Sequence, residues 1–139
     1  MPEGHRSRSA TVTSWIAQVA AAAILGQTLF FELTGSPESV AIFEALGAEP
    51  WGRLGTGTLE AVAVVLLLVP RTAALGGVLG LFLMMGAIGS HLVELGIEVQ
   101  GDGGTLFVMA VVTLAASATV VVLRRRSLPF VRGRGLSVG

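Results

Sequence analysis

Six polar side chains in this apolar sequence are of the types that carry protons, bind ions or hydrogen-bond a polar head group. They are Glu32, Arg53, Glu60, His91, Glu94 and Asp102. Two or more carboxylates with a guanidinium and an imidazole can form a proton relay, a pocket for a polar head group or a structural network of ion pairs. Which of these applies depends on the elements that position the six side chains.

The segment from His91 to Gly104 gathers one of the two histidines, three acids and four glycines between two apolar runs. The spacing of His91, Glu94 and Glu98 could place three metal ligands on one helix face. However, Gly96 should end the helix before Glu98, and a lone histidine with exposed acids makes a poor metal site, so we expect no metal here. The run from Gly101 to Gly104 lacks the lysine of a phosphate-binding loop.

Composition sets the class of protein. Of 139 residues, 53% are hydrophobic and 13% charged, and the mean hydropathy is +0.79. That leaves too little polar surface for a soluble domain, and nucleic acid is not an expected partner. Four runs are long enough to cross ~30 Å of hydrocarbon. The sequence therefore predicts an all-α integral membrane four-helix bundle over 14–123, with spans at about 14–33, 51–69, 72–95 and 105–123. The tails are 1–13 and 124–139.

The segments between these runs also carry structural signals. The first run is longer than the core of a signal peptide, so we expect it to be retained. Ser36 and Pro37 are typical of a helix start, which predicts a short helix over 37–46 on the membrane surface; an ordered loop is the alternative. Gly76 and Gly80 have the spacing of a helix-packing pattern, and Asp102 is placed to cap the last span. The absence of cysteine excludes disulfides and thiolate metal sites.

The arginines predict the orientation. A four-span arrangement places eight of them on one side of the membrane and only Arg53 on the other: Arg6, Arg8, Arg71, Arg124, Arg125, Arg126, Arg132 and Arg134. By the positive-inside rule, both termini are expected in the cytoplasm of a multi-pass protein of the cell inner (plasma) membrane. The 37–46 helix and the 91–104 segment then face the extracytoplasmic side.

Depth can be estimated from the helical rise. Counted from the cytoplasmic ends, Glu32 stands ~27 Å, Arg53 ~26 Å and His91 ~30 Å along their spans, with Glu94 just above. These residues form one predicted layer. Its plainer interpretation is that Arg53 pairs with Glu32 and that His91 makes a single hydrogen bond between helices.

Glu60 is predicted to lie apart from this layer, ~15 Å up its span and near the midplane. An acid at that depth is costly and usually functional. Its expected neighbours, Thr113, Gln27 and Thr28, are neutral, and desolvation without a cation favours the protonated acid. We therefore expect Glu60 to be neutral and to be the main proton-handling site.

Several short motifs stand out along the sequence: Leu33–Pro37, Phe43–Gly47 with Pro50-Trp51, Gly57–Glu60, Pro70–Ala74, His91-Leu92 and Gly101–Gly104. Together they resemble the DoxX-like family of small four-helix bacterial membrane proteins. The resemblance covers roughly 31–107 and implies four transmembrane helices and an association with quinone-linked respiratory redox enzymes. Over the matching positions, Glu60, His91 and Asp102 carry the polar groups. The missing cysteines depart from any thiol-based role of a relative.

Three functions follow as hypotheses. The first is an accessory or quinone-interacting subunit of a membrane redox system, with electrons from a partner redox enzyme; such a chain is a non-catalytic subunit rather than a self-sufficient enzyme. The second is a small proton-linked transporter or permeation unit lined by Glu60 and His91, which would require a homo-oligomer. The third is a structural membrane scaffold. The lipid bilayer is the expected partner in all three.

Overall fold

The computed structural model describes residues 7–128, which form helices and their connections without a strand. The helices are α1 (Arg8–Thr34), α2 (Pro37–Ala45), α3 (Trp51–Leu68), α4 (Ala73–Ser90) and α5 (Thr105–Arg124), with short 3-10 turns at Pro70–Thr72 and Arg125–Ser127 and a π-helical turn at His91–Leu95. Four helical segments are long and apolar enough to cross a membrane: Arg8–Thr34, Trp51–Leu68, Pro70–Leu95 and Thr105–Ser127. The predicted all-α membrane helical bundle is confirmed. Arg6, Arg132 and Arg134, which the orientation prediction places in the cytoplasm, lie outside the described residues, as does most of the C-terminal tail.

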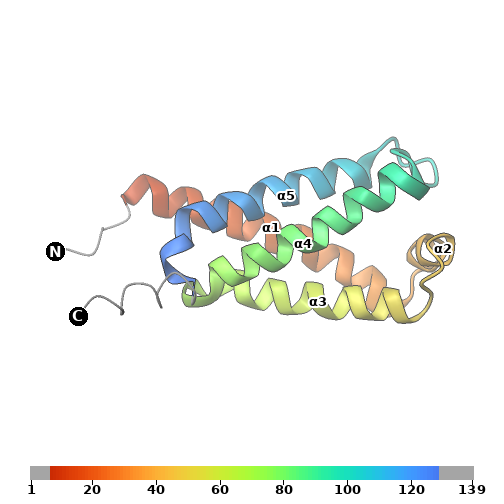
Figure 1. Cartoon of the computed structure of the whole chain (residues 1–139), viewed down its shortest axis with the longest axis horizontal. Helices are drawn as coiled ribbons and strands as arrows, with labels where there is room; N and C mark the ends of the chain where they lie inside the picture. The colour runs from red at the N-terminus through yellow and green to blue at the C-terminus, as the bar shows by residue number, and fades with distance from the viewer. Residues whose placement is uncertain (1–6, 129–139) are drawn as a thin grey trace.

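The four long helices form a ring in which each packs against two neighbours. Helix α1 contacts α3 and α5, and α4 contacts the same two helices. The start of α1, the Pro70–Thr72 turn and the end of α5 lie at one end of the bundle, which we call the Arg124 end (Figure 1). The short helix α2 lies at the opposite end, the α2 end. Toward the α2 end, α4 and α5 diverge from α1 and α3 (Figure 1).

The helix ends follow local capping signals. Ser36 caps α2 with its hydroxyl, which accepts a hydrogen bond from the Ser39 N–H at 3.3 Å, and Pro37 occupies the first turn, as predicted. Helix α1 begins six residues before the predicted span because the Ser7 hydroxyl caps it, accepting from the Ala10 N–H at 3.1 Å. Hydropathy located the apolar part of α1, whereas the cap determines where the helix starts.

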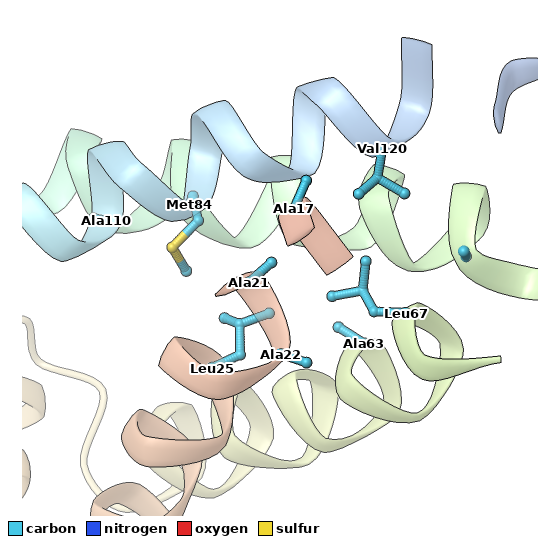
Figure 2. Packing of buried hydrophobic residues seen from close by; sticks show 10 residues of the cluster. Ala17, Ala21, Ala22, Leu25, Ala63, Leu67, Met84, Ala110 and Val120 are labelled. Atoms are coloured by element: carbon cyan, nitrogen blue, oxygen red, sulfur yellow. The ribbon is translucent and has the colours of Figure 1, made fainter. Parts of the chain in front are cut away.

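The buried core is a cluster of ten side chains from α1, α3, α4 and α5, six of which are alanines (Figure 2). The cluster is formed by Ala17, Ala21, Ala22, Leu25, Ala63, Leu67, Ala73, Met84, Ala110 and Val120. Gly76 confirms the predicted close packing, because a Cβ atom there would lie 2.7 Å from the Leu67 backbone nitrogen of α3. At Gly80 a Cβ atom would press on the Ser117 hydroxyl of α5. These glycines therefore allow α4 to approach α3 and α5 closely in the half of the bundle nearer the Arg124 end.

Candidate functional site

A cavity of about 890 Å³ lies at the α2 end, bounded by residues of all five helices and of the 96–104 segment. Its walls are mainly apolar, with contributions such as Leu25, Phe31, Phe82, Met84 and Leu106. The volume falls within the roughly 300–1,000 Å³ that is typical of pockets for small ligands. Four of the polar groups that line it were predicted site residues: Glu32, Glu60, His91 and Asp102.

Glu60 is anchored to α1 by Thr28, one of its three predicted neighbours. The Thr28 hydroxyl lies 3.1 Å from Glu60 Oε2, 2.9 Å from the Leu25 carbonyl oxygen and 3.2 Å from the Ile24 carbonyl oxygen. One hydroxyl proton cannot serve all three acceptors, and helical threonines commonly donate to the backbone of the preceding turn. The Thr28 hydroxyl can donate to Glu60 Oε2 or to a backbone carbonyl, so the contact accommodates a carboxylate that accepts the hydroxyl proton as well as a carboxyl group that donates its own.

Glu32 and Glu60 face each other across the α1–α3 interface, with their carboxyl groups within hydrogen-bonding reach. Glu60 is only 2% exposed. Glu32 Oε2 is also buried and meets no hydrogen-bond donor among the described residues if both groups are ionised. Two carboxylates this close repel each other, whereas one shared proton turns the repulsion into a hydrogen bond.

The prediction that Glu32 and Glu60 lie in separate layers was wrong. It compared Cα heights of ~27 Å and ~15 Å along the spans and ignored side-chain direction. Helical side chains lean toward the N-terminus of their own helix, and α1 and α3 run in opposite directions. Glu32 therefore leans away from the α2 end and Glu60 leans toward it, so the two carboxyl groups converge.

Arg53 does not form the predicted ion pair with Glu32. Its guanidinium binds the Glu49 carboxylate at 2.9 Å, and its Nη1 donates to the Glu32 backbone carbonyl at 2.6 Å. That carbonyl is one of the last of α1, and it also accepts a hydrogen bond from the Gly35 N–H at 3.3 Å in the C-terminal cap. Arg53 thus ties α3 to the end of α1. The spacing of four residues between Glu49 and Arg53 is the sequence signal that indicates this ion pair.

His91 is 6% exposed and lines the cavity. Its Nδ1 lies 2.8 Å from the Gly96 carbonyl oxygen, and its ring meets Phe107 edge to face with centroids 5.5 Å apart. Because a carbonyl only accepts, Nδ1 carries a proton, and Nε2 of the neutral ring is left as an acceptor. The hydrogen bond lies within the turn that follows α4, so the predicted bond between helices was wrong.

Asp102 and Glu94 do not join the Glu32–Glu60 carboxyl pair. The Asp102 carboxylate accepts hydrogen bonds from the N–H groups of Val99, Gly104 and Leu106 at 3.0, 2.8 and 3.1 Å, which confirms the predicted cap of the last span. These bonds hold the pKa of Asp102 below its ordinary value. Glu94 is exposed and does not line the cavity. Asp102 therefore orders the connection to α5, and Glu94 was wrongly grouped with the layer.

A second buried polar cluster lies at the Arg124 end and was missed. Arg124 Nε donates to Ser14 Oγ and Gln18 Oε1, each at 2.7 Å, and Gln18 Nε2 donates to the Leu67 carbonyl at 2.7 Å. The Arg124 guanidinium also lies 5.7 Å from the centre of the Trp15 ring. From the sequence, Arg124 was interpreted as an orientation signal. In the structure Arg124 joins α5 to α1, and Gln18 joins α1 to the end of α3.

The site therefore combines a carboxyl pair that can donate or accept a hydrogen bond with an imidazole nitrogen that can accept one, and both lie inside apolar walls. Among residues 7–128, no three His, Asp or Glu side chains are grouped so as to hold a metal ion. Comparisons with protein-family models, with curated proteins and with solved structures found no match.

Proposed function

We propose that the chain is a DoxX-like accessory subunit of a membrane redox system and that its cavity holds the head group of a quinone or quinol. The observation that carries this proposal is the Glu32–Glu60 carboxyl pair, buried in an apolar cavity within membrane-spanning helices. A ligand suited to such a place is mainly apolar and has a few oxygen atoms that exchange hydrogen bonds and protons.

The two states of a quinone match the groups in the cavity. A quinone carbonyl accepts a hydrogen bond from the protonated carboxyl pair, and a quinol hydroxyl donates one to a carboxylate or to His91 Nε2. Reduction of a quinone takes up two electrons and two protons. The electrons come from a partner redox enzyme, because this chain has no cysteine and only two histidines. The carboxyl pair lends or accepts protons and orients the head group.

The packing below the cavity favours a binding site over a permeation path. Ala21, Ala63, Leu67 and Val120 are 0% exposed and fill the bundle axis between the carboxyl pair and the Arg124 end. Beyond them, Arg124 is itself buried at 6% exposure. A path for a solute would have to open this core, whereas a ligand can occupy the cavity without disturbing it.

The orientation is part of the proposal. Among the arginines of residues 7–128, Arg8, Arg71 and the run 124–126 lie at the Arg124 end and only Arg53 lies at the α2 end, which supports cytoplasmic termini and an extracytoplasmic α2. Reporter fusions after Leu46 and Gly101 should report the extracytoplasmic side of the inner membrane. A fusion after Arg71 should report the cytoplasm. Cytoplasmic exposure of Gly101 would contradict this orientation.

Photolabelling in vesicles tests the binding proposal. A photoreactive benzoquinone dissolved in the lipid should label peptides that line the cavity. Glu60→Leu, which cannot exchange hydrogen bonds, should weaken labelling about tenfold, the equivalent of about 1.4 kcal/mol. Glu94→Leu is the matched control, since Glu94 is exposed outside the cavity, and it should label like the wild type. Equal labelling of both variants, or none in the wild type, would refute the proposal.

A further inference from the structure

The cavity reaches the sides of the bundle. Several residues that line it are themselves exposed, including Gln27 and Phe31 on α1, Thr105 on α5, and Phe82 and Gly86 on α4. Phe82 is 68% exposed and Phe31 44%. All five belong to the membrane-spanning segments. Because α4 and α5 diverge from α1 and α3 (Figure 1), the cavity faces the lipid between the two helix pairs.

The axial end of the cavity is spanned by residues of α2 and of the 96–104 segment. Ser39 and Val99 there are each 8% exposed, whereas Glu38 and Gln100 line the cavity and are exposed. Gln100 Nε2 donates to the Glu38 backbone carbonyl at 3.3 Å, which joins the two covering segments. Asp102 holds the 96–104 segment through three backbone N–H groups. A ligand from water would have to part this cover.

We propose that the ligand is an amphiphile dissolved in the bilayer, which enters sideways between the diverging helix pairs, places its polar head at the carboxyl pair and leaves its apolar chain in the lipid. This inference rests on the proposed function and narrows it to quinones with a long apolar chain. The chemistry of the walls supports it, because Phe31 and Phe82 present aromatic surface at the side openings whereas the carboxyl groups lie inside. An apolar chain in those openings stays in an apolar medium.

The chain offers matched positions for a test. Gln27 and Gly86 lie at side openings, whereas the nearby Gly26 and Gly89 do not line the cavity. A Cβ atom at any of the three glycines meets nothing within 4 Å, so larger side chains can be placed there without a clash at Cβ. Gln27→Trp with Gly86→Trp should obstruct the openings, and Gly26→Trp with Gly89→Trp adds the same aromatic mass elsewhere.

The experiment uses the full chain in vesicles and two photoreactive benzoquinones, one with a decyl chain and one without. The decyl probe should label the control pair at a rate within about twofold of wild type and the obstructed pair about tenfold more slowly. The probe without a chain should label the wild type about tenfold more weakly than the decyl probe. Should the double tryptophan variant misfold, Gln27→Cys can be folded first and then modified with a bulky maleimide, because no native cysteine competes.

The cover is tested separately. Glu38→Cys with Gln100→Cys, joined by a flexible bismaleimide, should leave decyl-probe labelling unchanged. Loss of labelling on closing the cover, with full labelling of the obstructed pair, would overturn sideways entry and leave the proposed function standing. Equal labelling by the two probes would overturn the proposed role of the ligand's apolar chain. Absence of labelling in the wild type by either probe would overturn the proposed function and this inference with it.

Discussion

Replacing Glu60 by glutamine distinguishes the two charge states of the carboxyl pair. If Glu32 and Glu60 were both ionised, two charges roughly 4 Å apart would repel by about 4 kcal/mol at an effective dielectric constant of 20. Removing one charge would then stabilise the bundle by a comparable amount. If the pair shares a proton, glutamine replaces a neutral carboxyl of nearly the same shape, and the free energy of unfolding should change by no more than about 1 kcal/mol.

We expect the smaller change, because two negative charges within hydrogen-bonding reach of each other in an apolar cavity would repel, whereas a shared proton joins the two groups by a hydrogen bond. The assay is reversible unfolding in detergent micelles at neutral pH, for the wild type, Glu60→Gln and the control Glu94→Gln. Infrared spectra should show a protonated carboxyl band in the wild type that is lost in Glu60→Gln. Glu60→Lys should prevent assembly, since it places an ammonium in the apolar cavity.

A stabilisation of Glu60→Gln by several kcal/mol would refute the shared proton. The pair would then be doubly ionised in the folded protein, which requires water or a cation beside it. A missing infrared band in the wild type would lead to the same conclusion. Loss of photolabelling is not expected for Glu60→Gln, because the amide still exchanges hydrogen bonds with a head group.

Three further predictions concern the frame around the cavity. Gln18→Leu removes one of the two acceptors of Arg124 Nε and the side-chain donor to the Leu67 carbonyl, and it should destabilise the bundle by about 2–4 kcal/mol, with part of the loss recovered in Gln18→Leu with Arg124→Met; a double-mutant cycle measures this, and strictly additive losses would contradict the contact. Gly76→Ala should cost about 1–3 kcal/mol in detergent unfolding because its Cβ would press on the α3 backbone, whereas Gly89→Ala should be near neutral; equal effects would contradict the close approach. The pKa of Asp102 is lower when folded, so its carboxylate stabilises the fold above its unfolded pKa of about 3.9 and this contribution is lost as pH falls through the folded value. The melting temperature of Asp102→Ala should therefore lie below that of wild type at neutral pH and approach it in acid, and a gap that does not change with pH would contradict the capping role.

Local features of this protein could be predicted from the sequence. The four spans follow from runs of apolar residues, and the start of α2 follows from Ser36 and Pro37, whose capping chemistry involves only the next few residues. The Asp102 cap is also local, since its three donors lie within four residues. Gly76 was recognised by its spacing because close helix packing requires small side chains whichever neighbour is met.

Only the tertiary structure decided which polar groups meet. The sequence placed Glu32 and Glu60 at different heights, and their convergence depends on the antiparallel arrangement of α1 and α3 and on the lean of each side chain toward its own helix start. An ion pair of Arg53 with Glu32 was predicted from their similar heights. The carboxylate that Arg53 binds is instead that of Glu49, four residues earlier in the chain. Arg124 belongs to an arginine run that the positive-inside rule reads as an orientation signal. Its burial against α1 depends on how α5 crosses that helix. Residue type and spacing determine what each helix presents, whereas the tilt and direction of its neighbours determine what that face contacts.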